Sequence, residues 1–219
     1  MKILLVGSEG KMGKEIKQCC EDNEVVFCVD TNCQESSSES RDIKNCKQPV
    51  DVIIDFSTSE SREPFLEYAK ERKISYGCFA TNINDNDMKK LKEASFEIPV
   101  LICKNTSVGM NVMFELVDSA SKTLDADIVL TERHHKMKKD SPSGSAKALE
   151  NILKKNGKIF STYAVRAGTE RGTHIVQFFM DDEILEIRHS AFSRKVFAKG
   201  ALVMAKKLIE QKFGLFEKL

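Results

Sequence analysis

The first half of the chain alternates short apolar runs with amphipathic stretches. Runs with the length of buried strands lie at 2–6, 24–29, 50–55, 74–78 and 99–103. The stretches between them that carry a helical period lie at 12–21, 60–72 and 84–95. Strands that alternate with helices predict a parallel sheet covered on both faces, because each crossover helix packs back onto the sheet.

The pattern changes after about residue 106. The periodicity predicts a long helix at 108–124, a strand at 126–132 and a helix after Ser143. Three further strands with short connections, which favour antiparallel pairing, are predicted at 160–165, 173–180 and 183–190.

Two segments complete the prediction. The polar, Ser-rich segment 34–49 is expected to be a mobile connection and not a core element. The amphipathic stretch 198–214 predicts a last helix with Gly214 as its C-cap. We therefore expect an α/β protein with two domains. A Rossmann-type, parallel-sheet domain comprises 1–105 with 193–219, and an α+β domain with a mostly antiparallel sheet comprises 106–192.

Composition narrows the class of protein. The 219 residues carry 31% charged and 41% hydrophobic side chains, with a formal net charge of +1, so the basic excess of a general nucleic-acid binder is missing. No apolar run approaches the roughly 18 residues of a membrane span, and no signal peptide is expected at the N-terminus. Seven cysteines without a CxxC pair predict free, mostly buried thiols in a reducing cytoplasm, and no ligand spacing predicts a metal site.

Glycines follow the first predicted strand in the stretch GSEGKMG. Gly7, Gly10 and Gly13 stand at the start of a helix, where glycine permits a tight turn and lets backbone amides approach a pyrophosphate. Asp30 follows the second strand, where a carboxylate can accept hydrogen bonds from ribose hydroxyls. A structural turn without a ligand is the alternative. Residue 31 is Thr and not Arg, which favours NADH over NADPH, although Lys11 leaves NADPH open.

The segment TERHHKMKKDSPSGS, residues 131–145, gathers two histidines and three lysines before a helix start. Backbone amides at that start, in Ser143-Gly144-Ser145, can hold a carboxylate, although a plain N-cap is the commoner explanation. His134 and His135 are expected to point to different sides. Lys138 is a candidate proton donor. A hydride donor, an acid and a carboxylate clamp together describe reduction of a C=C or C=N bond.

These residues resemble the 4-hydroxy-tetrahydrodipicolinate (dihydrodipicolinate) reductase family, which acts in the diaminopimelate route to lysine. The family's E-x-H-H-x-x-K-x-D-x-P-S-G-T-A is similar to residues 132–146, with Ser145 in place of the Thr. Further similar stretches are GSEGKMG, DFSTSE, NTSVGMNV, VRAGTERGTHIV, SRKVFAKGA and GLFEKL. The resemblance covers nearly the whole chain, in the family's short form.

The resemblance implies roles for individual residues. Lys138 would donate the proton with His134 as the acid–base residue beside it, and His135, Gly144 and Ser145 would bind the dicarboxylate substrate. Dinucleotide contacts are implied for Gly7, Ser8, Glu9, Gly10, Lys11, Met12, Asp30, Phe79, Ala80, Thr81, Cys103, Lys104, Asn105 and Thr106. The second domain would bind substrate and assemble a cytoplasmic homotetramer through its sheet.

One segment departs from the family. Phe79-Ala80-Thr81-Asn82 stands where the family has G-T-T-G, and Phe79 and Asn82 adopt positive φ less readily than glycine does. This departure keeps a second hypothesis open, a non-catalytic NAD(H)-binding sensor with the same fold. A third reading, an RNA-binding patch at 133–147, is disfavoured by the net charge and by the lack of interleaved aromatic residues.

Overall fold

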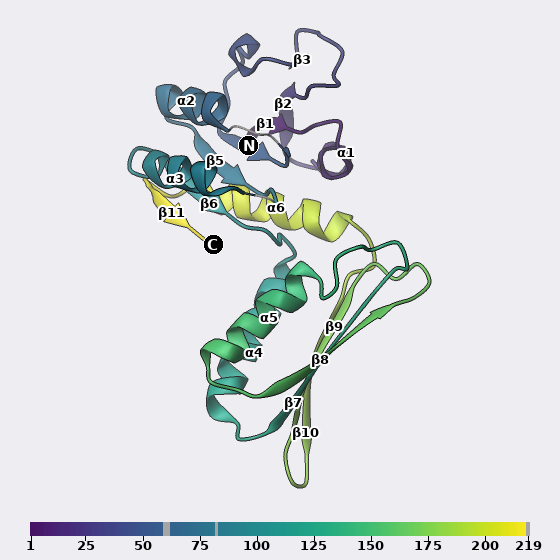
Figure 1. Cartoon of the computed structure of the whole chain (residues 1–219). Coiled ribbons are helices and arrows are strands. Elements are labelled where there is room, and N and C mark those ends of the chain that lie inside the picture. Colours follow the sequence, from purple (N-terminus) through teal and green to yellow (C-terminus); the bar gives the residue numbers. More distant parts are fainter. Residues whose placement is uncertain (59–61, 82, 218–219) are drawn as a thin grey trace. The chain divides into compact units, whose positions relative to one another are not determined.

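The computed structural model describes residues 1–58, 62–81 and 83–217, and the chain forms two compact units (Figure 1). The first unit comprises Met1–Thr106 with Phe197–Leu219, and the second comprises Ser107–Val196. The sequence pattern puts these boundaries at 105/106 and 192/193. Of the predicted features, Asn82, positions 60–61 of the second helix and the ends of DFSTSE and GLFEKL lie outside the described residues.

The first unit is built on a seven-stranded sheet in the order β11-β6-β5-β4-β1-β2-β3, in which every neighbouring pair is parallel. The strands are β1 (Lys2–Val6), β2 (Glu24–Val29), β3 (Glu39–Ser40), β4 (Val52–Asp55), β5 (Ser75–Cys78), β6 (Pro99–Ile102) and β11 (Gly214–Phe216). The chain order reverses between β1 and β4, as in doubly wound folds, so the predicted Rossmann-type parallel sheet is confirmed.

Helices cover both faces of this sheet. They are α1 (Lys11–Gln18), α2 (Glu63–Arg72), α3 (Asp85–Ala94) and α6 (Lys195–Leu208), with a 3₁₀ turn η1 (Ile43–Asn45). Apolar residues of α2 and α3 share one core cluster with the sheet, and apolar residues of α1 and α6 share the other. All seven cysteines are free thiols, and six of them are buried. Burial on both faces explains why the strands read as continuous apolar runs.

Two expectations for this unit are wrong. The last helix ends at Leu208, and Gly214 does not cap it but begins β11, which pairs with β6 at the sheet edge. Segment 34–49 is not simply a mobile connection, since it contributes β3 and buries Ile43 and Cys46 in the core. Two apolar side chains in a polar stretch give too short a signal for hydrophobic periodicity to detect.

A buried arginine fixes the carboxyl end of β4. Arg62 is fully buried and donates to Asp55 through Nε at 2.9 Å and to Asp87 through Nη1 at 2.5 Å. Tyr76 donates its hydroxyl to Asp55 at 2.6 Å, and Arg62 also donates to the carbonyl of Ser57. These four side chains lie in or beside β4, β5, α2 and α3, so their bonds hold the four elements together. Removing one partner of the ion pair would leave an uncompensated buried charge.

The second unit is a four-stranded sheet, in the order β10-β9-β7-β8, packed against two helices. Its elements are α4 (Val108–Thr123), β7 (Asp127–His134), α5 (Gly144–Lys155), β8 (Phe160–Arg166), β9 (Thr173–Phe179) and β10 (Ile184–Ser190). The pairs β7–β9 and β9–β10 are antiparallel, as expected. Strand β8 instead pairs with β7 in parallel, because α5 makes the crossover between them. None of the helices in the described part of the chain is long and apolar enough to cross a membrane.

Candidate functional site

The glycine turn of the first unit lies where β1 ends and α1 begins. Gly7 has φ +79° and donates its N–H to the Val29 carbonyl at 2.8 Å. A Cβ at Gly7 would lie 2.9 Å from the Ser57 amide nitrogen, so only glycine allows the two turns to approach. Gly10 is the N-cap of α1 and supplies no capping side chain. The first backbone amides of α1 are therefore suitably placed to bind an anion.

The carboxylate of Asp30 lies directly beside this turn. Its Oδ2 accepts from the Glu9 amide at 2.9 Å, and its Oδ1 accepts from the Asn32 amide at 2.9 Å. Glu39 adds a second carboxylate, which accepts from the buried Ser8 hydroxyl at 3.3 Å. The structure thus brings the predicted ribose-binding acid and the predicted pyrophosphate turn together at the carboxyl edge of the sheet.

The remaining cofactor candidates of this unit follow β5 and β6 at the same edge. Phe79 and Ala80 are buried, and the Phe79 ring stacks on Phe56 with 5.4 Å between centroids. Positive φ occurs at Glu21 and Lys73 among the described non-glycine residues, so the segment that replaces G-T-T-G does not need it at 79–81. The Cys103 side chain is buried and Thr106 donates its hydroxyl to the Phe197 carbonyl, whereas Thr81 and Lys104 are exposed. Cofactor contacts of Phe79 and Ala80 would therefore fall to their backbone groups.

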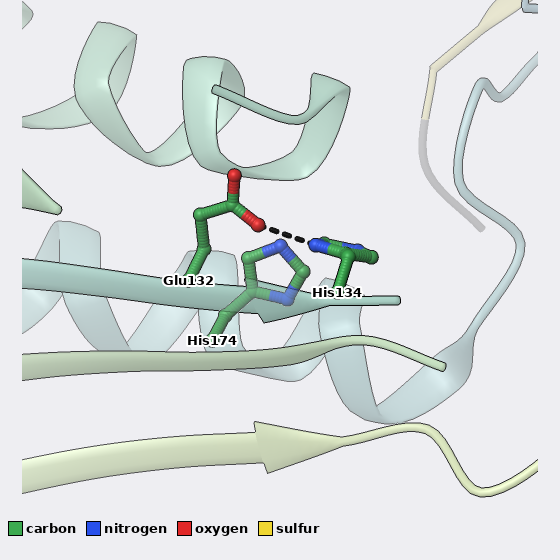
Figure 2. Close-up of side chains that lie close together, drawn as sticks. All are labelled: Glu132, His134 and His174. Atoms are coloured by element: carbon green, nitrogen blue, oxygen red, sulfur yellow. Dashed lines mark hydrogen bonds and ion pairs between the residues drawn. The ribbon is translucent and has the colours of Figure 1, made fainter. Parts of the chain in front are cut away.

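In the second unit, alternation along β7 places Glu132 and His134 on the face that packs on the helices. Glu132 is fully buried, and its Oε2 accepts a hydrogen bond from His134 Nδ1. Its Oε1 accepts from the backbone amide of Ser143 at 3.1 Å and from Arg166 Nη2 at 2.7 Å. Figure 2 shows the Glu132 carboxylate turned toward the His134 ring, with the His174 ring beside both.

Lys138 lies in the turn that follows β7. Its Nζ is 2.8 Å from Asp140 Oδ1, and its side chain is 23% exposed, whereas Lys136 and Lys139 are exposed. Partial burial raises the pKa of Asp140, but the hydrogen bond and the charge of Lys138 lower that pKa by more, so its carboxyl is held below its ordinary range. The Asp140 carbonyl also accepts from Arg166 Nη2 at 2.6 Å. The Lys138 side chain is thus held beside an ionised carboxylate.

The start of α5 is fixed by Ser143 and His174. Ser143 is the N-cap, its Oγ accepts from the Ala146 amide, and it lies 3.0 Å from His174 Nε2. An equivalent contact is made from the neighbouring strand β10, where His189 Nε2 lies 3.1 Å from Oγ of Ser107, the N-cap of α4. Each serine oxygen accepts from a helix amide, and its hydroxyl can donate to the imidazole in the tautomer that leaves Nε2 unprotonated.

Burial sets the charge of these histidines. Burial lowers the pKa of His174 to about 4, with the nearby His134 acting in the same direction. Burial also lowers the pKa of His134, and Glu132 offsets that effect only in part. Burial raises the pKa of Glu132, but hydrogen bonds from Arg166 and His134 outweigh it, so the net shift is downward. The favoured state at neutral pH is ionised Glu132 beside neutral His134 and His174.

The predicted carboxylate-binding residues lie at this helix start and in the turn after β7. Gly144 is exposed, and a Cβ there would meet no atom within 4 Å, so the first turn of α5 is open to a ligand. Ser145 is half-buried beside it. His135 follows the end of β7, is half-buried, and donates its amide to the Glu170 carbonyl at 2.7 Å. As expected, His134 lies on the packed face of the strand, whereas His135 lies beyond the strand in the turn that carries Lys138.

Glu132, His134 and His174 also place three possible metal-ligand atoms within 4.8 Å of one another. Both oxygens of Glu132, His134 Nδ1 and His174 Nε2 already have other partners, whereas His174 Nδ1 is buried without one among the described residues. Arg166 and Ser143 bond to one oxygen of Glu132, His134 bonds to the other, and His174 Nε2 bonds to Ser143. A cation would have to displace these bonds and would lie near the Arg166 guanidinium, so the donor set fits a hydrogen-bond network better than a metal site.

Sequence reasoning gave no role to Glu132, Arg166 or His174. Period-two alternation could have placed Glu132 beside His134, since residues i and i+2 of a strand share a face. Arg166 and His174 come from other strands, opposite His134 and Glu132 respectively. Strand register is required to find these two, and the sequence pattern does not supply it.

The substitution His174→Gln is expected to make folding stability less dependent on pH. Because the folded pKa of about 4 lies below the ordinary 6.5, the unfolded chain takes up a proton as the pH falls from 6.5 to 4 while the folded chain does not. This site then removes up to roughly 3 kcal/mol of stability at the acid end of that window. Urea unfolding from pH 4 to 8 measures the slope. Ser143→Ala is the control, since it removes the same hydrogen bond but keeps the imidazole and hence the slope. Parallel curves for wild type and His174→Gln would contradict the assignment.

Known proteins of one family match this chain along almost its whole length. The family model for the dihydrodipicolinate reductase N-terminus matches residues 1–106, and the model for its C-terminus matches residues 109–218. The 4-hydroxy-tetrahydrodipicolinate reductase of Caldanaerobacter subterraneus subsp. tengcongensis is 38% identical and the match covers 99% of this chain and 96% of that protein. The enzyme of the same name from Bdellovibrio bacteriovorus is 36% identical, over 99% and 94%.

Solved structures show the same fold at low sequence identity. Dipicolinate-bound dihydrodipicolinate reductase from Paenisporosarcina sp. TG-14 aligns with a TM-score of 0.81 at 17% identity, covering 99% of this chain and 97% of that one. A myo-inositol dehydrogenase from Corynebacterium glutamicum aligns with a TM-score of 0.62 at 12% identity, covering 98% and 90%. With both family models matched and the 38% relative covered almost end to end, the chain belongs to the dihydrodipicolinate reductase family.

Proposed function

We propose that this protein reduces 4-hydroxy-tetrahydrodipicolinate to tetrahydrodipicolinate in the diaminopimelate route to lysine. Membership of the family over almost the full chain supports the reaction. The observation that carries the proposal is the arrangement in the second unit. An ammonium group, Lys138, is held in the turn between β7 and an exposed helix start at Gly144, beside a neutral histidine. The cytoplasm is the proposed location, because all seven cysteines are free thiols and a reducing compartment keeps them so.

The chemistry divides between hydride and proton. A bound nicotinamide supplies the hydride to one atom of the substrate double bond, and the neighbouring atom must receive a proton. The Lys138 ammonium is the donor in this proposal, because Asp140 holds it at 2.8 Å and its side chain retains access to solvent for reprotonation. His134 acts beside it as the acid–base residue.

The substrate's carboxylates are assigned to the start of α5. Amides of Gly144 and Ser145 lie in the first turn, where the helix dipole favours an anion. The absence of steric contact at Gly144 leaves room for a carboxylate to approach the backbone. His135, half-buried in the preceding turn, is the second proposed carboxylate ligand.

NADH is the proposed cofactor, with NADPH as a weaker substitute. The Asp30 carboxylate is anchored by two backbone amides at 2.9 Å, with Glu39 on the adjacent strand. Two carboxylates near the expected ribose would repel a 2′-phosphate but accept hydrogen bonds from ribose hydroxyls. Lys11, exposed at the first position of α1, is the cation that could offset part of this repulsion. The other proposed contacts are Gly7, Ser8, Glu9, Gly10, Met12, Phe79, Ala80, Thr81, Cys103, Lys104, Asn105 and Thr106.

A homotetramer assembled through the second unit's sheet is also proposed. One face of that sheet packs on α4 and α5. On the opposite face, Tyr163 is 58% exposed, Val165 40% and Ile184 57%. An apolar sheet face of this kind is typical of an interface, and further copies of the chain are its proposed partners.

A coupled assay tests the reaction and the cofactor together. Oxidation of NADH is expected only when aspartate semialdehyde and pyruvate are condensed to supply the substrate, with a lower KM for NADH than for NADPH. Pyridine-2,6-dicarboxylate is expected to inhibit competitively with the substrate. Calorimetric binding of NADH without any substrate-dependent oxidation would instead support a non-catalytic sensor.

Replacing the proposed acid is expected to abolish most of the turnover. Lys138→Ala should lower kcat by about 10²–10⁴-fold, the range for loss of a general acid. Lys139→Ala is the matched control, since Lys139 is exposed in the same turn, and its kcat should match the wild type. Stopped-flow or steady-state measurement of NADH oxidation gives kcat for both variants. A Lys138→Ala enzyme within a few-fold of wild type would show that another group donates the proton.

The tetramer is tested by a paired substitution on the open sheet face. The change Tyr163→Glu with Val165→Glu puts two charges into the proposed interface and should shift the mass from four chains to fewer. Light scattering after size exclusion measures the mass. Lys155→Glu, at the exposed end of α5, is the control and should leave the mass unchanged. A wild-type protein with the mass of one chain would rule the assembly out.

A further inference from the structure

We propose that Glu132 is a positioning residue that joins the proton-donating half of the site to its carboxylate-binding half. The inference rests on the roles proposed above for Lys138, His134 and the start of α5. Glu132 need not touch substrate or cofactor. It is fully buried, and its two oxygens bond to groups that belong to different halves of the site (Figure 2).

The first oxygen sets the tautomer of His134. An ionised carboxylate can only accept, so Oε2 requires a proton on Nδ1 of His134. The ring is neutral when burial dominates, and its Nε2 then carries a lone pair. Residue 172 must be glycine beside this ring, because a Cβ there would lie 2.8 Å from Nε2. His134 therefore presents a hydrogen-bond acceptor, which makes it a base that can orient or receive a proton, while donation falls to Lys138.

The second oxygen fixes the start of α5. Oε1 accepts from the Ser143 amide at 3.1 Å, and Ser143 is the N-cap residue that precedes Gly144 and Ser145. On its other side Ser143 bonds through Oγ to His174 Nε2 at 3.0 Å. The N-cap is thus held between a carboxylate and an imidazole, so the amides that follow it have a defined direction.

Arg166 extends the same network to the lysine. One Nη2 atom donates to Glu132 Oε1 at 2.7 Å and to the Asp140 carbonyl at 2.6 Å, and Asp140 pairs with Lys138. Burying a carboxylate requires compensation by donors or cations, and here each compensating group also belongs to the site. Acid, imidazole and anion clamp consequently share a single anchor.

Two substitutions separate the two halves. In Glu132→Gln the amide oxygen can still accept from Ser143, whereas the NH₂ group facing His134 must donate. The proton of His134 then moves to Nε2, so the lone pair is lost. We expect kcat to fall by at least about tenfold while the inhibition constant of pyridine-2,6-dicarboxylate stays within about threefold. Glu132→Ala removes both acceptors, and it should weaken inhibitor binding by at least about tenfold as well.

The decisive readout is the tautomer, which ¹⁵N–¹H NMR of the imidazoles reports directly. The wild type should carry the His134 proton on Nδ1 and Glu132→Gln should carry it on Nε2. Glu170→Gln is the matched control, because it removes a carboxylate from a half-exposed pair with Arg133 in the same unit and should change neither tautomer nor kcat.

Three results would overturn the proposal. They are an unchanged tautomer in Glu132→Gln, a Glu132→Gln kcat within about threefold of wild type, and undiminished inhibitor binding by Glu132→Ala. If the variants do not fold, the wild-type spectrum alone decides, since a proton on Nε2 of neutral His134 contradicts the assigned geometry. A wild-type enzyme without activity would refute the proposed function instead, and the tautomer would remain a separate measurement.

Discussion

The second unit depends on one buried negative charge. Glu132 lies on the packed face of β7, where a carboxylate without partners would cost several kcal/mol. Its compensation comes from three sources: a guanidinium from β8, an imidazole two residues along its own strand, and a backbone amide at the start of α5. A charge in this place therefore forces two strands and a helix start into a single arrangement. Apolar packing alone tolerates many alternatives, whereas a buried charge with directed bonds tolerates few.

The first unit uses the same solution with the opposite sign. Arg62 is fully buried between Asp55 and Asp87, and Tyr76 adds a hydroxyl. The ion pair between Arg62 and Asp55 fixes the end of β4. The turn after β4 approaches Gly7 so closely that a methyl group on Gly7 would not fit between them. Nucleotide-type glycine turns need a rigid neighbour because backbone amides must point in one direction before a ligand arrives. An ion pair within the core supplies that rigidity without a side chain entering the turn.

Periodicity predicted the elements well where burial is simple. Runs buried on both sides, such as 2–6 and 50–55, became parallel strands because nothing else satisfies an apolar run of that length between helices. It failed where an element is short or its neighbour is distant. Strand β11 has three residues, β3 has two, and the position of β8 beside β7 depends on a crossover that pairing rules for short loops do not anticipate. Site residues followed the same division. Lys138 and Ser143 belong to one continuous segment, whereas Arg166 and His174 join it only through strand register.

The paired histidines of β9 and β10 have a consequence for that register. His174 and His189 stand opposite each other, and each bonds to the N-cap serine of a different helix. A slip of one residue in either strand would turn an imidazole to the far side of the sheet and withdraw it from its serine. The strand register in this unit is therefore fixed by two polar contacts as well as by the packing of its apolar core. Because His174 bonds to the N-cap serine of α5, a misaligned β9 would withdraw the contact that fixes the start of this helix, where the proposed anion site lies.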